Sequence, residues 1–216
     1  MNFEFTKEHK MLRVTIRKFL EKELIPIVEE IDEKEHFPRE VYKKLGEMGF
    51  IGSHLPVEYG GSGGDFVGKC LLSEEISKVS AGFEMSMDLS GVIYANPINQ
   101  FGTEEQKQKY LPPVLGGDKM GAWALTEPNA GSDVLSIRTT ARREGEYFII
   151  NGSKTFITNA PIADYFVIQT RTSGKGIEGG TAFIKIAPEN PILWTGMKGA
   201  SAESRKNKSD AETSSA

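Results

Sequence analysis

The hydrophobic pattern of this chain changes near Gly121, and the change restricts the folds open to it. Before Gly121, apolar residues recur at spacings of three and four, which is typical of amphipathic helices. After it, the stretch from Arg138 to Thr158 alternates β-favouring and polar residues, as half-buried strands do. The pattern predicts an α+β fold in which an all-α helical bundle precedes an antiparallel β-domain.

Capping and breaking residues set the expected helix ends. Thr6 is the expected N-cap of the first helix, and Pro26 predicts a kink or break in it, because proline has no amide hydrogen to donate. Cys70 follows Val67 at apolar helical spacing and is expected in the core, as are Met85 and Met87. Further helices are expected over 38–48, 66–79, 80–102 and from 104 onward, with Gly49, Asp65, Ser80, Gly102 and the capping box 103–106 at their ends.

Turn signals divide the second half into strands. Glu144-Gly145 and Asn151-Gly152 each predict a hairpin turn, and Asn-Gly between two strands is the stronger signal. Two more strands are expected over 164–171 and 181–186. We place the domain boundary near Gly117, which gives a helical domain over 1–117 and a β-domain over 118–188.

The last stretch, 189–216, has no apolar period and is rich in Ser, Ala, Lys and Glu. Such a composition is typical of disordered tails. The sheet would then end with unpaired edges, which natural proteins avoid. We therefore expect a partial β-domain followed by a tail that is disordered, read out of frame or otherwise truncated.

Charge and cysteine content exclude several function classes. The net charge is -4 and the pI about 5.6, whereas nucleic acids and anionic membranes select basic surfaces. No stretch reaches the roughly 18 apolar residues of a membrane span. The one cysteine rules out an intrachain disulfide and favours a cytoplasmic location. The three histidines lack metal-ligand spacing, so no metal is expected.

Two segments of the second half have the residue types of a binding site. The first, WALTEPNAGSDV at 123–134, places a turn of small residues after a strand. Such a turn can present amides and hydroxyls to a phosphate or carbonyl oxygen. The second is NGSKTFITN at 151–159.

Together these segments resemble the signatures of the acyl-CoA dehydrogenase family, flavoproteins that oxidise the α,β bond of acyl-CoA thioesters. LPVEYGG at 55–61 and FGTEEQKQKYLP at 101–112 are supporting matches in the same order. The resemblance covers about residues 1 to 187. It implies FAD as cofactor, acyl-CoA as substrate, an electron-transferring flavoprotein as partner, and homo-oligomers formed mainly through a C-terminal domain.

The resemblance also assigns roles to residues of both segments. Ser132 matches a position that approaches acyl-CoA as well as the cofactor. Phenylalanine at position 156, often tryptophan in the family, keeps a ring that can cover the flavin. The positions that match flavin contacts are Trp123, Leu125 and Thr126, then Gly131 and Ser132 beside the pyrophosphate, and Phe156, Ile157 and Thr158 along the flavin ring.

No catalytic residue is expected in this chain. The resemblance places the glutamate that removes the α-proton in a C-terminal helical domain, so the chain alone is expected to be inactive. Glu127 is not expected to replace it, because it belongs to the first signature. Two alternatives stay open: another branch of the superfamily, either an acyl-CoA oxidase or a flavin monooxygenase, and a catalytically inactive fragment.

Overall fold

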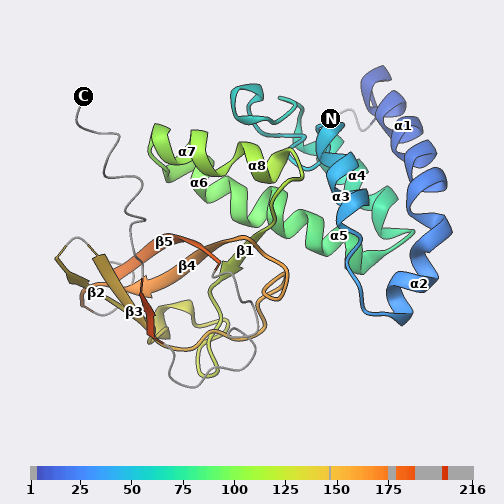
Figure 1. The fold of residues 1–216 in the computed structure, drawn as a ribbon. Helices are drawn as coiled ribbons and strands as arrows, with labels where there is room; N and C mark the ends of the chain where they lie inside the picture. Colours follow the sequence, from blue (N-terminus) through green and yellow to red (C-terminus); the bar gives the residue numbers. More distant parts are fainter. Residues whose placement is uncertain (1–3, 146, 175–178, 188–200, 204–216) are drawn as a thin grey trace, which may run out of the picture. The chain divides into compact units, whose positions relative to one another are not determined.

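The computed structural model describes residues 4–145, 147–174, 179–187 and 201–203. It divides into two compact units, a helical one that extends to Gly121 and a sheet-containing one that begins at Ala122 (Figure 1). The predicted order of helices followed by strands is confirmed, and with it the α+β fold class.

The first unit consists of helices and helical turns. Its α1 ends at Glu23 and a 3-10 turn with Pro26 follows, which confirms the predicted break. The elements are α1 (Lys7–Glu23), η1 (Ile25–Ile27), α2 (Val28–Glu33), α3 (Arg39–Glu47), η2 (Val57–Tyr59), α4 (Phe66–Ser77), α5 (Ala81–Asp88), the π-helical η3 (Leu89–Tyr94), α6 (Ala95–Phe101), α7 (Glu104–Tyr110) and α8 (Pro112–Leu115).

The predicted caps begin four of these helices. Thr6 and Thr103 form capping boxes at α1 and α7. Asp65 and Ser80 each accept a hydrogen bond from the amide three residues further on, at α4 and α5. Each cap satisfies an amide that the helix itself leaves without a partner. The core that these helices enclose includes the fully buried Ile16, Leu24, Leu45, Ile51, Leu72, Ile76, Met87, Tyr94, Val114 and Leu115.

The prediction that Cys70 lies in the core is wrong. The buried residues of α4 lie at 68–69, 71–72 and 75–76, so Cys70 is on the opposite face and is exposed, as is Val67. The α5 methionines divide in the same way: Met87 is fully buried, but Met85 is 53% exposed. One position along a helix rotates a side chain by about 100°, which is enough to turn it from the core to solvent.

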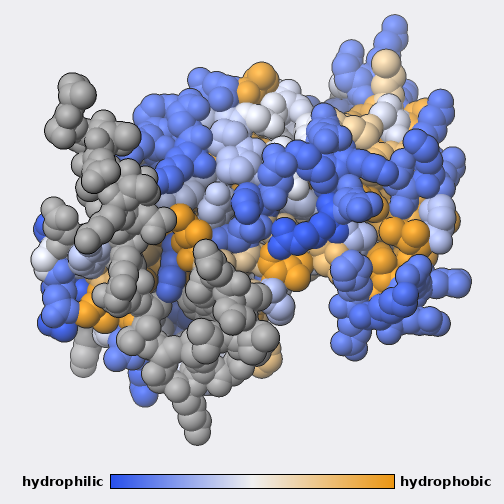
Figure 2. Space-filling view, in the orientation of Figure 1, coloured by the Kyte–Doolittle hydropathy of each residue, from blue (hydrophilic) through white to orange (hydrophobic). Residues whose placement is uncertain are grey.

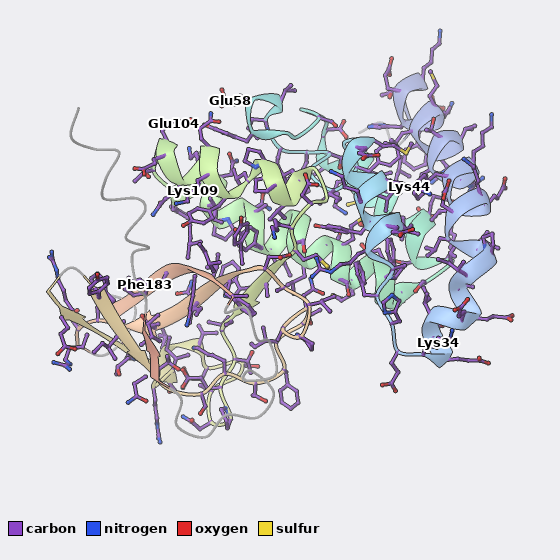
Figure 3. All side chains as sticks on the ribbon, in the orientation of Figure 1. Lys34, Lys44, Glu58, Glu104, Lys109 and Phe183 are labelled. Carbon is purple, nitrogen blue, oxygen red and sulfur yellow. The ribbon has the colours of Figure 1, made fainter. Side chains whose placement is uncertain are left out.

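Ion pairs join α1 to α3 and α4. Arg17 Nε lies 2.6 Å from an oxygen of Glu75, and Lys44 Nζ lies 2.5 Å from Glu23. Lys44 extends from α3 in Figure 3. The hydrogen bond from Arg17 lowers the pKa of Glu75 to about 2, so this nearly buried carboxylate stays charged at neutral pH.

Among the described residues, six strands form the sheet of the second unit, and their order is β1-β4-β2-β3-β6, with β5 also paired to β4. The pairs β2–β3, β3–β6 and β4–β5 are antiparallel, but β2 and β4 are parallel at Thr140 and Arg171, so the sheet is mixed. Phe183, labelled in Figure 3, packs against Phe148, and the centroids of the two rings are 4.8 Å apart. The strands are β1 (Gly121–Ala124), β2 (Thr140–Glu144), β3 (Tyr147–Asn151), β4 (Tyr165–Arg171), β5 (Gly180–Ile186) and β6 (Ser201–Glu203).

One of the two predicted hairpins is confirmed. Strands β2 and β3 pair on either side of the turn at Gly145. The hairpin at Asn151-Gly152 is wrong, because residues 152–164 form no strand after β3. Lys154 and Thr155 instead make hydrogen bonds to Leu125 and Thr126, so the segment follows the first signature and not β3.

The predicted tail, 189–216, lies outside the described residues except for 201–203, whose backbone pairs with β3 as β6. In the described part of the chain, no helix is long and apolar enough to cross a membrane. On the face drawn in Figure 2, hydrophilic residues dominate and hydrophobic residues form separate patches.

Candidate functional site

The first signature leaves β1 and reverses direction at once. Glu127 and Ala130 bond to each other through both backbone amides, with N–O distances of 2.9 and 3.2 Å, and Pro128 and Asn129 are exposed at the tip. The chain then passes through exposed residues 131–136, which include the short 3-10 turn η4 (Val134–Ser136). The small residues of the signature therefore lie on the surface of the sheet unit.

The second signature runs beside the first. The amide of Thr155 donates to the carbonyl of Thr126 at 2.9 Å, and the ammonium of Lys154 donates to the carbonyl of Leu125 at 2.8 Å. These bonds join segments that are nearly thirty residues apart in sequence. The structure thus brings Leu125 and Thr126 to the start of the stretch that contains Phe156.

Glu127 turns away from solvent and binds three donors. Its carboxylate accepts from the amides of Arg138 at 2.6 Å and Thr139 at 2.9 Å, and from Lys154 Nζ at 2.9 Å. Burial acts to raise the pKa of Glu127, but the hydrogen bonds from Thr139, Arg138 and Lys154 outweigh it, so this pKa is lowered. Burial also lowers the pKa of Lys154, against the attraction of Glu127. A carboxylate with these bonds holds chain segments together and is not available as a catalytic base.

Phe156 has an unusual backbone and an unusual environment. Its φ is +55°, in the left-handed region that bulky residues rarely occupy, and its side chain is 90% exposed. Asn159 also has a positive φ of +67°, but it is buried, and its carbonyl accepts the amides of Ile162 and Ala163 at 2.9 and 2.7 Å. A strained backbone that presents an apolar ring to solvent is a feature of functional sites.

The other predicted site residues lie around these segments. Trp123 is on β1, and its indole nitrogen is buried without a hydrogen-bond partner among the described residues. Gly131 and Ser132 are exposed beyond the Glu127–Ala130 reversal. Leu125, Thr126, Ile157 and Thr158 are half-buried.

Comparison with protein families decides the relationship. The family described as Acyl-CoA dehydrogenase, N-terminal domain, matches residues 6–118, and that described as Acyl-CoA dehydrogenase, middle domain, matches residues 122–209. The chain belongs to the acyl-CoA dehydrogenase family. The predicted resemblance is confirmed, and the two matched domains meet where the helical and sheet units divide.

Relatives in this family differ in what their names describe. The short-chain specific acyl-CoA dehydrogenase of Clostridium acetobutylicum is 47% identical over 185 residues, which are 85% of this chain and 49% of that protein. Subunit CarC of the caffeyl-CoA reductase-Etf complex of Acetobacterium woodii is 42% identical over 182 residues, 83% of this chain and 48% of that one. An acyl-CoA dehydrogenase complexed with FAD, from Bacillus anthracis, has a TM-score of 0.77 at 39% identity, over 85% of this chain and 32% of its own. The chain thus spans about half the length of the curated relatives it matches.

The exposed residues of the acyl-CoA dehydrogenase signatures are suited to the FAD that the resemblance implies. Phe156 offers an uncovered ring face on which a flat ring system can stack. A Cβ atom added at Gly131 would lie more than 4 Å from every neighbouring atom. The backbone at this position therefore has room beside it for a phosphate group. The carbonyls of Leu125 and Thr126 already accept hydrogen bonds from the second signature, whereas the amides and the hydroxyls of Thr126, Ser132 and Thr158 are the polar groups left that could contact such a ligand.

Two residues that hold this site were not singled out by the sequence. Lys154 lies inside the second signature, but no local pattern shows that its ammonium is buried. Arg171 ends β4 and donates from Nε to the carbonyl of Ile137 at 2.8 Å, and from Nη2 to that of Leu135. Both residues bind backbone carbonyls far away in sequence, and a backbone carbonyl leaves no mark in the sequence.

Proposed function

We propose that this chain forms the flavin-binding face of an FAD-dependent oxidoreductase that oxidises the α,β carbon–carbon bond of an acyl-CoA thioester. The observation that supports this most directly is Phe156, whose strained backbone presents an exposed ring next to the segment with Thr126. Family membership and the relative complexed with FAD point to the same cofactor. When bound, FAD supplies the acceptor for the hydride that leaves the acyl chain.

Each segment has a separate task in this proposal. Phe156 would cover one face of the flavin and exclude water from it, and Trp123, Leu125 and Ile157 would help to hold the ring. The hydroxyls of Thr126 and Thr158 would donate hydrogen bonds to the flavin and so favour negative charge on it.

The turn after the Glu127–Ala130 reversal binds the phosphates. The amides of Gly131 and Ser132 are on exposed backbone with open space beside it, so they can approach a pyrophosphate closely. Ser132 also contacts the acyl-CoA substrate in this proposal. Glu127 is not the base that removes the α-proton, because both its oxygens accept hydrogen bonds inside the unit.

We infer that the partner of this chain is an electron-transferring flavoprotein, which would accept the electrons that bound FAD supplies. A relative named as a subunit of a caffeyl-CoA reductase-Etf complex supports this choice of partner. We also infer homo-oligomers, as the resemblance implies, and a cytoplasmic location, which rests on the single cysteine of the sequence.

Titration of the purified chain with FAD tests this function. We expect the flavin absorption band to shift on binding, and the affinity for FAD to fall about 10-fold in Thr158→Val, which removes one hydroxyl donor. Thr172→Val is the matched control, because Thr172 is exposed and lies outside both signatures. A wild-type chain that leaves the flavin spectrum unchanged would overturn the proposal.

Anaerobic addition of acyl-CoA separates an oxidoreductase from a flavin-binding fragment. Bleaching of the bound flavin supports oxidation of the acyl chain. Flavin that stays oxidised is the result expected for this chain alone, because the resemblance places the glutamate that removes the α-proton in a C-terminal domain, whereas bleaching would contradict that expectation.

A further inference from the structure

A buried ion pair connects the two signatures. Lys154 Nζ lies 2.9 Å from Oε1 of Glu127, and the two side chains are only 11% and 2% exposed. Each partner also binds backbone: Lys154 the carbonyl of Leu125, and Glu127 the amides of Arg138 and Thr139. One pair of charges therefore reaches three separate stretches of the chain.

The pair exposes little surface from which to touch a ligand. Burial of two charges costs desolvation energy, and such a pair often adds little net stability compared with apolar residues of the same size. A buried ion pair also imposes one arrangement on the chain segments that it joins. Here it joins the backbone of Leu125, just before Thr126, to the second signature, where Lys154 lies two positions before Phe156.

We propose that Glu127 and Lys154 are positioning residues, which fix the two signature segments against each other before any cofactor binds. Through the backbone of Leu125 and Thr155, the pair sets where Thr126 and Phe156 lie. This inference rests on the proposed function for its consequence, a flavin site that is already formed in the free chain. Its structural part, the fixed geometry of the two segments, stands without that function.

The reason lies in the kind of bonds that join these segments. Residues 152–164 contain no strand, and the second signature meets the first through the backbone bond from Thr155 to Thr126 and the side-chain bond from Lys154 to Leu125. A ladder of backbone bonds would hold such segments without side chains, as it holds β2 against β3. The signature segments lack such a ladder. Loss of the Lys154 ammonium therefore leaves the carbonyl of Leu125 without this donor, and it leaves the buried carboxylate of Glu127 with one donor fewer.

Hydrogen exchange of the full chain without ligand tests the structural part. In Lys154→Met, we expect the amide of Thr155 to exchange about 10-fold faster, and in Glu127→Gln the same for Arg138 and Thr139. The control is Lys69→Met, which removes another buried lysine, paired with Asp88 between α4 and α5 of the helical unit. This control leaves exchange at the three amides unchanged.

Titration with FAD tests the positioning role. We expect Lys154→Met to weaken FAD binding about 10-fold, and Lys154→Arg, which keeps the charge and the donors, to retain most of the affinity. The double variant Glu127→Gln with Lys154→Met removes the unpaired charge. It is expected to recover thermal stability but not the affinity for FAD, because the bond to the Leu125 carbonyl is still missing.

Two results would overturn the inference: unchanged exchange of Thr155 in Lys154→Met, or full recovery of FAD affinity together with stability in the double variant. If Lys154→Met does not fold, the same exchange and FAD titrations are made on Lys154→Arg and on the double variant, and their results decide whether the pair positions the segments. If the wild-type chain binds no FAD, the proposed function fails, whereas the exchange rates measured without ligand still decide whether the pair fixes the segments.

Discussion

Backbone polar groups find their partners differently at the helix ends of the helical unit and in the two signature segments of the sheet unit. In the helical unit, caps such as Thr6 and Thr103 bind an amide three residues away. In the sheet unit, Lys154 binds a carbonyl 29 residues away, and Arg171 binds one 36 residues away. A lost cap frees one end of a helix whose remaining turns persist, whereas a lost long-range donor frees a segment that no regular helix or strand holds in place.

This difference suggests where substitutions matter most. The signature segments are held by donors that are distant in sequence, so single changes at these donors should have larger effects than changes at exposed helix ends. Four kinds of substitution test this difference. In decreasing order of their expected effect on stability, they add atoms where two backbone segments lie close, remove a long-range donor, change a buried charge, or relieve backbone strain.

The largest effect is expected for Gly152→Ala. A Cβ at this position would lie 2.6 Å from Thr139 Cα and 2.3 Å from its Oγ1, so the backbone before β2 has to move. We expect a loss of about 3 kcal/mol in the free energy of unfolding, measured by urea denaturation. Gly131→Ala is the control, because its Cβ meets no atom within 4 Å and should change stability by less than about 0.5 kcal/mol. Equal losses of stability in the two variants would show that the backbone of Thr139 can move away from a side chain at position 152 at little cost.

Arg171→Met should have the next largest effect. It keeps the apolar stem of the side chain but removes the donors to the carbonyls of Leu135 and Ile137. We expect a loss of about 2 kcal/mol in the free energy of unfolding and faster proteolysis near residues 133–137. Arg142→Met, at an exposed position of β2, is the matched control. A protease-resistant Arg171→Met chain would contradict the role assigned to this residue.

Acid should act in opposite directions on Glu84 of the helical unit and Glu127 of the sheet unit. Burial and the neighbouring Asp88 raise the pKa of Glu84 in α5 to about 6, so the folded helical unit binds a proton that the unfolded chain, with a pKa of 4.5, releases. The contribution of Glu84 to the stability of this unit is therefore expected to be lost as pH rises from 4.5 to 6, by on the order of 1 kcal/mol. The pKa of Glu127 is lowered, so its contribution is complete above pH 4.5 and is lost as pH falls below that value.

Thermal unfolding between pH 3 and 7, with hydrogen exchange to separate the units, measures both slopes. Glu84→Gln should remove the loss of stability between pH 4.5 and 6, and Glu127→Gln should remove the acid sensitivity of the amides of Arg138 and Thr139. A pH profile that neither substitution alters would show that these carboxyl groups do not govern the response to acid.

The same difference in range explains what the sequence could predict. Caps such as Asp65 and breaks such as Pro26 act on residues within a few positions, so their sequence signals were sufficient. The Asn151-Gly152 hairpin failed because Lys154 binds Leu125 instead of continuing a strand, and that partner is distant in sequence. The candidate site was located by its resemblance to a family, but neither the exposure nor the positive φ of Phe156 could be predicted, because both follow from tertiary contacts.

The smallest effect is a gain in stability, expected for Phe156→Asn. Asparagine tolerates the left-handed backbone better than phenylalanine, and a ring that is 90% exposed contributes little burial. We expect the free energy of unfolding to rise by about 0.5 to 1 kcal/mol, whereas FAD binding weakens because the ring face is lost. Phe101→Asn is the control, since Phe101 is 83% exposed but ends α6 with a helical backbone, so it should bring no gain. A gain in stability without loss of FAD affinity would mean that the strain at Phe156 serves something other than the flavin.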